Sequence, residues 1–171
     1  MKSRASAVLA VVALVVAGCG STKTVTKTVT VTSGGSVPPR ELVFYGHVKS
    51  LRRVGNGFEL RVDPALWLGG LTAQRAAVED KAIAPGEPVP NDYYIRDEGH
   101  RLLMYRVPAT ARVTVLTYKG RIRGTSISVR EYAALLAGRN PRHIRLFEPK
   151  AGFWIRVATD TVRSLEQQYQ P

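Results

Sequence analysis

Acidic side chains near a tryptophan are the first residues of this sequence whose types can support chemistry. Asp63 and Asp80 lie on either side of Trp67, and an indole ring beside carboxylates can serve as a platform for a ligand such as a sugar. A hydrolase of glycans or peptides would draw its acid and base from Asp63, Asp80, Asp92 and Glu98, at a separation that only the fold fixes. The alternative is a core tryptophan next to a turn and a capping carboxylate.

A second group of polar residues comprises Asn91-Asp92, Asp97-Glu98 and His100. It lacks the twelve-residue loop of calcium sites and the paired His or Cys ligands of zinc sites. One short strand is expected between Asp92 and the turn at 97–100, which would separate the two ends by about 15 Å. We interpret the group as a turn whose carboxylates face water or nearby arginines. We therefore expect no metal and no cofactor.

Nucleophilic catalysis has no supporting pattern in the sequence. No Gly-x-Ser-x-Gly occurs, and His47, His100 and His143 are scattered along the chain. The only cysteine, Cys19, stands near the N-terminus at the end of an apolar run. The sequence thus favours a non-enzymatic protein, with a hydrolase that uses paired carboxylates as the alternative.

The surroundings of Cys19 are typical of an export signal. Lys2 and Arg4 precede an apolar run from Ala5 to Ala17, which is shorter than the roughly 20 residues that a membrane-spanning helix needs. The residues Val16-Ala17-Gly18-Cys19 resemble the lipobox of bacterial lipoproteins. The resemblance implies cleavage after Gly18, lipidation of Cys19, and a protein held by acyl chains on the extracytoplasmic face of the cell membrane. An ordinary secretory signal is the alternative.

The mature chain is expected to begin with a tether. Residues 19–40 contain a short Thr-Lys-Thr-Val repeat and end in Gly, Ser and Pro, without acidic or aromatic side chains. Such a segment buries too little apolar surface to offset its ordering entropy, so we predict disorder, with a strand as the alternative. The sequence therefore divides into a signal peptide (1–18), a tether (19–40) and one globular domain (41–171).

Basic residues dominate the composition and gather in one stretch. The chain carries 25 Lys and Arg against 13 Asp and Glu, a formal net charge of +12. The interval 119–150 includes five arginines that we single out as binding candidates: Arg121, Arg123, Arg139, Arg142 and Arg145. Positive charge attracts lipid headgroups, anionic wall polymers or an acidic envelope protein, without specificity of its own. Nucleic acid is a poor candidate because no recognition motif is present.

The first half of the domain reads as strands interrupted by one helix. Alternating apolar residues predict a strand over 41–54, and Gly55-Asn56-Gly57 predicts a tight hairpin turn into a strand over 58–62. Asp63-Pro64 is expected to end that strand, and 65–70 to form a turn or a helical segment. Thr72 is expected to cap a helix that reaches about Lys81, and the prolines at 85–90 indicate a loop.

The second half is expected to contain two hairpins, a strand and a helix. The hairpins are predicted over 92–107 and 152–169, with a strand over 113–117 and a basic loop around Gly120 and Gly124. Ser128 and Glu131 form a capping box for a helix that ends at Gly138. Local strand pairing with interposed helices predicts an α+β fold: a curled, mostly antiparallel sheet or a small OB-like barrel, with two short helices.

Several segments of the domain resemble a group of uncharacterised exported proteins of actinobacteria. The matching segments are residues 62–68, 76–80, 90–95, 153–155 and 166–169. The group has no activity to carry over, so the resemblance implies a distinct exported domain and no mechanism. Together these patterns predict a lipid-anchored envelope protein whose small basic domain binds an anionic envelope component or a protein partner.

Overall fold

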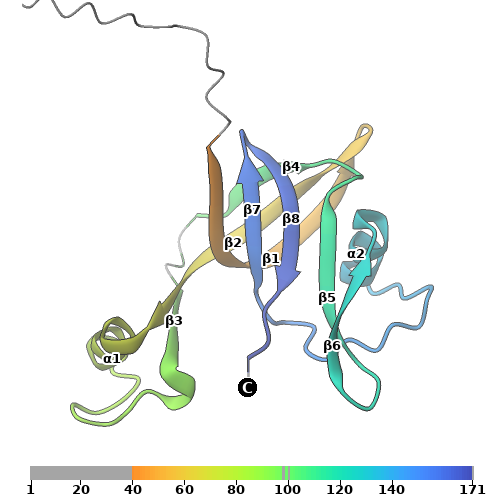
Figure 1. The fold of residues 1–171 in the computed structure, drawn as a ribbon. Coiled ribbons are helices and arrows are strands. Elements are labelled where there is room, and N and C mark those ends of the chain that lie inside the picture. The colour runs from red at the N-terminus through yellow and green to blue at the C-terminus, as the bar shows by residue number, and fades with distance from the viewer. Residues whose placement is uncertain (1–39, 98, 100, 171) are drawn as a thin grey trace, which may run out of the picture. The chain divides into compact units, whose positions relative to one another are not determined.

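The computed structural model describes residues 40–97, 99 and 101–170, and these form an α+β fold (Figure 1). Eight strands make a mixed, mostly antiparallel sheet in this part of the chain, accompanied by two α-helices and a short 3-10 turn. This confirms the fold class expected from the sequence. The elements are β1 (Glu41–Val54), β2 (Gly57–Gly69), α1 (Gly70–Glu79), η1 (Pro90–Asp92), β3 (Tyr93–Asp97), β4 (Leu103–Val107), β5 (Arg112–Tyr118), β6 (Ile122–Ile127), α2 (Val129–Leu136), β7 (Phe153–Ala158) and β8 (Thr161–Gln167).

Strand pairing follows the order β3-β2-β1-β7-β8-β5-β6. β4 pairs with β2 along its length and with β8 at a single parallel bridge between Arg106 and Thr161. Pairing therefore links β2, β1, β7, β8 and β4 into a ring, which the single bridge between β4 and β8 completes. We describe the arrangement as a curled sheet rather than as a barrel.

The β1–β2 hairpin is confirmed, but β2 continues past the point where the sequence predicted its end. Asp63 and Pro64 lie inside β2, and the stretch expected as a turn or helical segment is strand as far as Gly69. Pro64 is accommodated because it pairs with Gly46, where a β-carbon would lie 2.7 Å from the Asp63 carbonyl oxygen and 3.2 Å from the Pro64 α-carbon. A proline opposite a glycine allows the two backbones to approach closely without a side chain between them.

Helix α1 begins earlier than the sequence predicted. Gly69 is its N-cap and Gly70 its first residue, so the expected cap at Thr72 is wrong. The helix buries its alanines, Ala73, Ala76 and Ala77, and ends at Glu79 before the Asp80 C-cap. α1 and β3 lie along the far half of β2, on an extension away from the rest of the sheet (Figure 1).

The predicted hairpin over 92–107 is wrong, although both of its strands exist. β3 pairs with residues 65–69 of β2, and β4 pairs with residues 58–62 of the same strand. The two strands thus follow one another along one edge of β2 instead of pairing together. This arrangement depends on the unexpected length of β2, which supplies partners for both.

The basic loop expected around Gly120 and Gly124 is also wrong, because residues 122–127 form β6 and pair with β5 over six positions. Gly120 has a φ of +73° in the tight turn between these strands, where glycine is favoured. The hairpin over β7 and β8 is confirmed. So is the capping box of α2, in which the Ser128 hydroxyl accepts a hydrogen bond from the Glu131 amide.

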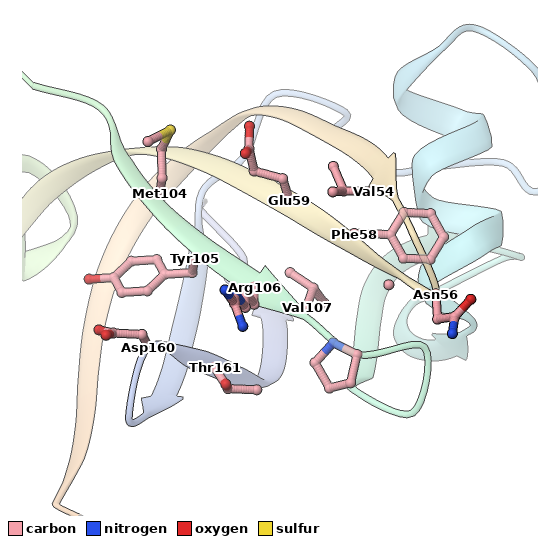
Figure 2. Close-up of a pocket in the computed structure, with 12 residues that line it drawn as sticks. Val54, Asn56, Phe58, Glu59, Met104, Tyr105, Arg106, Val107, Asp160 and Thr161 are labelled. Carbon is pink, nitrogen blue, oxygen red and sulfur yellow. The ribbon is translucent and has the colours of Figure 1, made fainter.

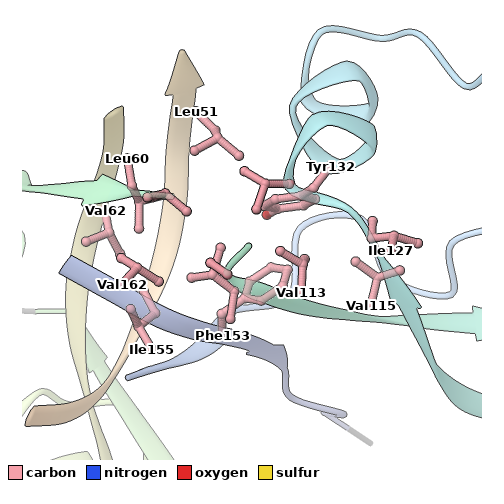
Figure 3. Packing of buried hydrophobic residues seen from close by; sticks show 14 of the residues in the cluster. Leu51, Leu60, Val62, Val113, Val115, Ile127, Tyr132, Phe153, Ile155 and Val162 are labelled. Carbon is pink, nitrogen blue, oxygen red and sulfur yellow. The ribbon is translucent and has the colours of Figure 1, made fainter. Parts of the chain in front are cut away.

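The core lies inside the curled sheet and beneath α2. Figure 3 shows Leu60 and Val62 from β2, Ile155 from β7 and Val162 from β8 near its centre, all of them fully buried. α2 adds the Tyr132 ring, which packs 5.3 Å from the ring of Phe153. Over the described residues, no helix is both long and apolar enough to span a membrane.

Candidate functional site

A basic pocket of about 320 Å³ lies between the β5–β6 hairpin and the loop that follows α2. We call it the β5–β6 pocket. Ten residues line it: Thr117, Tyr118, Lys119, Arg123, Gly124, Thr125, Arg142, His143, Ile144 and Arg145. Four of them carry a fixed positive charge, and none carries a negative one.

Backbone pairing holds one wall of the pocket in place. The Tyr118 amide donates to the Arg145 carbonyl at 3.1 Å, and the Phe147 amide donates to the Leu116 carbonyl at 2.9 Å. Residues 145–147 therefore run antiparallel to the end of β5, on the edge that β8 leaves unpaired. This places the Arg145 guanidinium 5.6 Å from the centre of the Tyr118 ring, a cation–π contact that orients it.

The turn that carries Arg142 and His143 is organised by Asn140. Its side-chain amide donates to the Ile144 carbonyl at 2.7 Å, and its side-chain oxygen accepts from the Ile144 amide at 2.8 Å. The His143 amide also donates to the Asn140 carbonyl. His143 takes a φ of +49° in this turn, so the loop is fixed by three hydrogen bonds rather than by burial.

The charges of the pocket are only partly neutralised. Arg142 forms an ion pair with Glu131 at 2.8 Å, and the Glu131 carboxylate also accepts hydrogen bonds from Ser128. Hydrogen bonds from the Ser128 backbone, Arg142 and the Ser128 hydroxyl lower the pKa of Glu131 to about 2. Lys119, Arg123 and Arg145 make no ion pair with any acidic side chain in 40–97, 99 or 101–170.

Three of the five arginines singled out from the sequence converge here: Arg123, Arg142 and Arg145. Arg139 lines a different hollow beside α2, and Arg121 lines neither. Sequence reasoning did not find the role of Tyr118, because its contact with Arg145 depends on pairing between segments 27 positions apart. The clustering of Lys and Arg was the available signal, and it identified the region but not the pocket.

Trp67 belongs to an aromatic cluster on one face of the sheet. Its ring stacks on Tyr93 at 4.2 Å and contacts Tyr45 at 5.1 Å and Trp154 at 5.9 Å. Its neighbours thus occupy much of the ring surface that a sugar would need. One carboxylate oxygen of Glu148 is buried without a hydrogen-bond partner among the described residues, and this carboxylate adds to the raised pKa values of Tyr45 and Tyr93, which burial mainly causes.

The structure does not bring Asp63 and Asp80 together beside Trp67. Asp63 forms an ion pair with Lys49 at 3.0 Å, on the same face as Trp67. Asp80 binds Arg96, at 2.8 Å, and Tyr94. Because Trp67 pairs with Ile95 and side chains alternate along a strand, Tyr94 and Arg96 point to the opposite face. The Arg96 guanidinium lowers the pKa of Asp80.

Of the other two acidic candidates only Asp92 is described, and it pairs with neither Asp63 nor Asp80. Asp92 is exposed in η1 and shares no hydrogen-bond or ion-pair partner with Asp63 or Asp80 in the described structure. Glu98 and His100 lie outside the described residues, as do Gly18, Cys19 and the whole of 1–39. Within the described residues, no three His, Cys, Asp or Glu side chains are grouped so as to hold a metal ion.

A more apolar hollow of about 780 Å³ surrounds β4 near the ring-closing bridge (Figure 2). Figure 2 shows the Tyr105 ring and the Asp160 carboxylate on one side of β4 and Met104 on the other. Burial, with the Asp160 charge, raises the pKa of Tyr105. The charges that line this hollow are mixed, since Glu59 and Asp160 face it together with Arg106.

No family model, curated protein or solved structure matches this chain. The resemblances to bacterial lipoproteins and to exported actinobacterial proteins therefore stay predictions from the sequence.

Proposed function

We propose that this chain is a lipid-anchored, extracytoplasmic binding protein whose folded domain holds a phosphate-bearing component of the cell envelope, a lipid headgroup or a wall polymer. One observation carries the proposal: Lys119, Arg123 and Arg145 face one pocket together and have no acidic partner in the described structure. Like charges held this close repel one another, and an anion bound between them relieves that repulsion.

The chemistry of the pocket fits phosphate. Guanidinium groups bind phosphate oxygens through two parallel hydrogen bonds, and a lysine adds a point charge. The volume of about 320 Å³ is at the small end of the range for ligand pockets, roughly 300–1,000 Å³, and suits a headgroup or one repeating unit of a polymer. Arg142 is partly neutralised by Glu131, so it positions the wall more than it adds charge.

The proposed location at the cell membrane rests on the sequence alone. Lipidation at Cys19 would attach the chain to the membrane, and the tether of residues 20–40 reaches at most about 70 Å when extended. The folded domain would thus stay within the surface layer of the cell. Near an anionic membrane each basic residue contributes about 1 kcal/mol to binding. The pocket would therefore orient the domain and select its ligand, while the acyl chains attach the protein to the membrane.

A vesicle-binding experiment tests this function. The chain from residue 19 with Cys19→Ser keeps every strand and helix described and removes the acyl anchor. We expect it to sediment with phosphatidylglycerol vesicles and not with phosphatidylcholine vesicles. Soluble polyglycerol phosphate should compete if the wall polymer is the ligand, and should fail to compete if the headgroup within a membrane is required.

Matched variants separate the pocket from net charge. Arg123→Gln with Arg145→Gln should weaken binding about tenfold or more, since each charge-assisted contact is worth about 1.5–3 kcal/mol. Arg112→Gln with Arg163→Gln removes the same charge from exposed positions of β5 and β8 and should weaken it far less. Equal losses in the two double variants would reduce the proposal to nonspecific attraction and overturn it.

The hydrolase that the sequence offers as an alternative gains no support from the geometry. Asp63 is held by Lys49 on the face of the sheet that carries Trp67, and Asp80 is held by Arg96, whose side chain is on the opposite face.

A further inference from the structure

A second hollow, of about 840 Å³, lies between α2 and the turn end of the β1–β2 hairpin. We call it the α2 groove. Eleven residues line it: Leu51, Arg53, Phe58, Arg130, Glu131, Ala133, Ala134, Ala137, Arg139, Asn140 and Pro141. It shares the loop after α2 with the β5–β6 pocket, since 139–141 faces the groove and 142–145 faces the pocket.

The floor of the α2 groove is apolar. Leu51 is 7% exposed and belongs to the core, and Phe58 and Ala133 pack against the same core. Figure 2 shows the Phe58 ring on the side of β2 next to α2. Small side chains at Ala133, Ala134 and Ala137 leave space above this floor. Water in such a space gains little from its walls, so an apolar group that enters it is stabilised.

The rim of the α2 groove is positively charged. Arg53, Arg130 and Arg139 line it, are exposed, and make no ion pair with any described acidic side chain. The one acidic residue of the lining, Glu131, is already bound by Ser128 and Arg142. An apolar floor with three uncompensated arginines at its rim complements a ligand that has an apolar body and an anionic head.

The size of the groove favours a lipid chain over a standard protein–protein interface. A specific protein interface uses about 20–30 residues on each side, whereas eleven residues line the groove. A single hydrocarbon chain needs no wider surface, and its methylene groups each gain from burial.

We propose that the α2 groove is a binding site for an anionic amphiphile, with its acyl chain on the apolar floor and its head on the rim arginines. The site is separate from the β5–β6 pocket and does not depend on the function proposed for that pocket. It would let the domain hold the chain of a lipid as well as recognise a phosphate.

Dodecyl phosphate below its micelle concentration is the probe that tests this site, with dodecyl maltoside as the neutral chain and inorganic phosphate as the head alone. Calorimetry on the Cys19→Ser chain from residue 19 measures affinity, and NMR shifts locate the ligand. We expect dodecyl phosphate to bind about tenfold more tightly than either control, with shifts at Leu51, Ala133 and Ala134. Shifts at Leu51, Ala133 and Ala134 that inorganic phosphate causes as strongly as dodecyl phosphate, or dodecyl phosphate shifts confined to the β5–β6 pocket, would overturn the proposal.

Two kinds of variant test the chain and the head separately. Ala134→Trp fills the groove and should abolish binding, whereas Ala109→Trp, in the exposed turn after β4, should not. Arg130→Gln with Arg139→Gln keeps the floor intact and should weaken dodecyl phosphate about tenfold while leaving dodecyl maltoside unchanged.

The two proposals fail independently. Lys119→Gln with Arg123→Gln should lower vesicle binding and leave the dodecyl phosphate shifts at the groove residues Leu51, Ala133 and Ala134 unchanged. If an acidic helical peptide shifts the groove residues and dodecyl phosphate does not, the occupant is a protein and the lipid proposal is wrong.

Discussion

The side chain of Tyr45 lies directly against the α-carbon of Gly152, so that a β-carbon at position 152 would overlap the phenol hydroxyl. Tyr45 is 1% exposed, and Gln170 donates a hydrogen bond to its hydroxyl from the C-terminal segment. The absence of a side chain at 152 thus allows β1, the segment before β7 and the chain end to meet at one point.

Gly152→Ala is therefore expected to destabilise the fold by about 1–3 kcal/mol, because the buried ring must move to admit a methyl group. Urea unfolding measures the change. Gly69→Ala is the control: nothing lies within 4 Å of the added carbon and φ is −127°, so its only expected cost is that of alanine at the N-cap of α1, at most about 1 kcal/mol. Equal effects of the two substitutions would mean that the contact with Tyr45 is not the cause.

Tyr45 also predicts how the fold responds to alkali. Burial raises its pKa from 10.0 to about 12, against the opposing effect of hydrogen bonds from Gly152 and Gln170. The folded state holds the proton more tightly than the unfolded state, so this stability is complete below pH 10 and is lost as the pH rises toward 12.

Urea unfolding at intervals between pH 9 and pH 12 measures this loss, which for one tyrosine is at most about 1.4 kcal/mol per pH unit. Tyr45→Phe should be less stable at neutral pH, because it loses the hydroxyl contacts, but should show a shallower alkaline decline. Tyr132, whose pKa burial also raises, remains in both proteins. An identical slope in Tyr45→Phe would exclude Tyr45 as the titrating group.

Glu131 should cause the fold to lose stability at acid pH, whereas Tyr45 does so at alkaline pH. Its pKa is lowered from 4.5 to about 2 by Ser128 and Arg142, so its contribution is complete above pH 4.5 and is lost as the pH falls toward 2. Protonation of Glu131 should weaken both the capping box of α2 and the ion pair between Glu131 and Arg142. Hydrogen exchange of the first-turn amides of α2 measures this, and Ser128→Ala should make exchange faster at neutral pH and less dependent on acid.

Local signals explain which parts of the fold the sequence predicted correctly. The β1–β2 turn, the β7–β8 hairpin and the capping box of α2 are each specified within a few residues. The pairing of β3 and β4 with β2 is not, because it depends on β2 running through Pro64, and Pro64 fits only because Gly46 stands opposite it. A proline next to an aspartate is a turn signal unless its distant partner is known.

The candidate sites, like the pairing of β3 and β4 with β2, depend on contacts between residues that are distant in the sequence. The run of Lys and Arg located the basic region, but the separation of Arg139 from Arg145 into two hollows follows from the fold of the loop between them. Arg53 belongs to the α2 groove although it is far from that run in sequence. The sequence shows where basic residues are numerous, but only the fold shows which of them face the same hollow.

Asn140 links the two hollows, so its substitution should affect both. Asn140→Ala removes the two side-chain hydrogen bonds to Ile144 that fix the loop. We expect weaker binding of phosphatidylglycerol vesicles and of dodecyl phosphate, with a stability loss of about 1–2 kcal/mol for two hydrogen bonds at an exposed position. Asn140→Asp keeps the side-chain acceptor and loses the donor, so its binding and its stability should lie between those of the unsubstituted protein and Asn140→Ala. Unchanged binding of both ligands in Asn140→Ala would show that neither site needs an ordered loop.

The last prediction concerns the anchor itself. Cys19→Ser removes the thiol that would carry the lipid, and we expect the protein to lose its acyl mass and to leave the membrane fraction for the medium. Ser21→Ala, two residues beyond the lipobox, is the control and should stay on the membrane. Because the basic domain can also bind anionic lipid, the membranes should be washed at about 1 M salt, where charges are screened within roughly 3 Å. Retention of Cys19→Ser after that wash would rule out the lipid anchor, since acyl chains, unlike charge attraction, hold a protein regardless of salt.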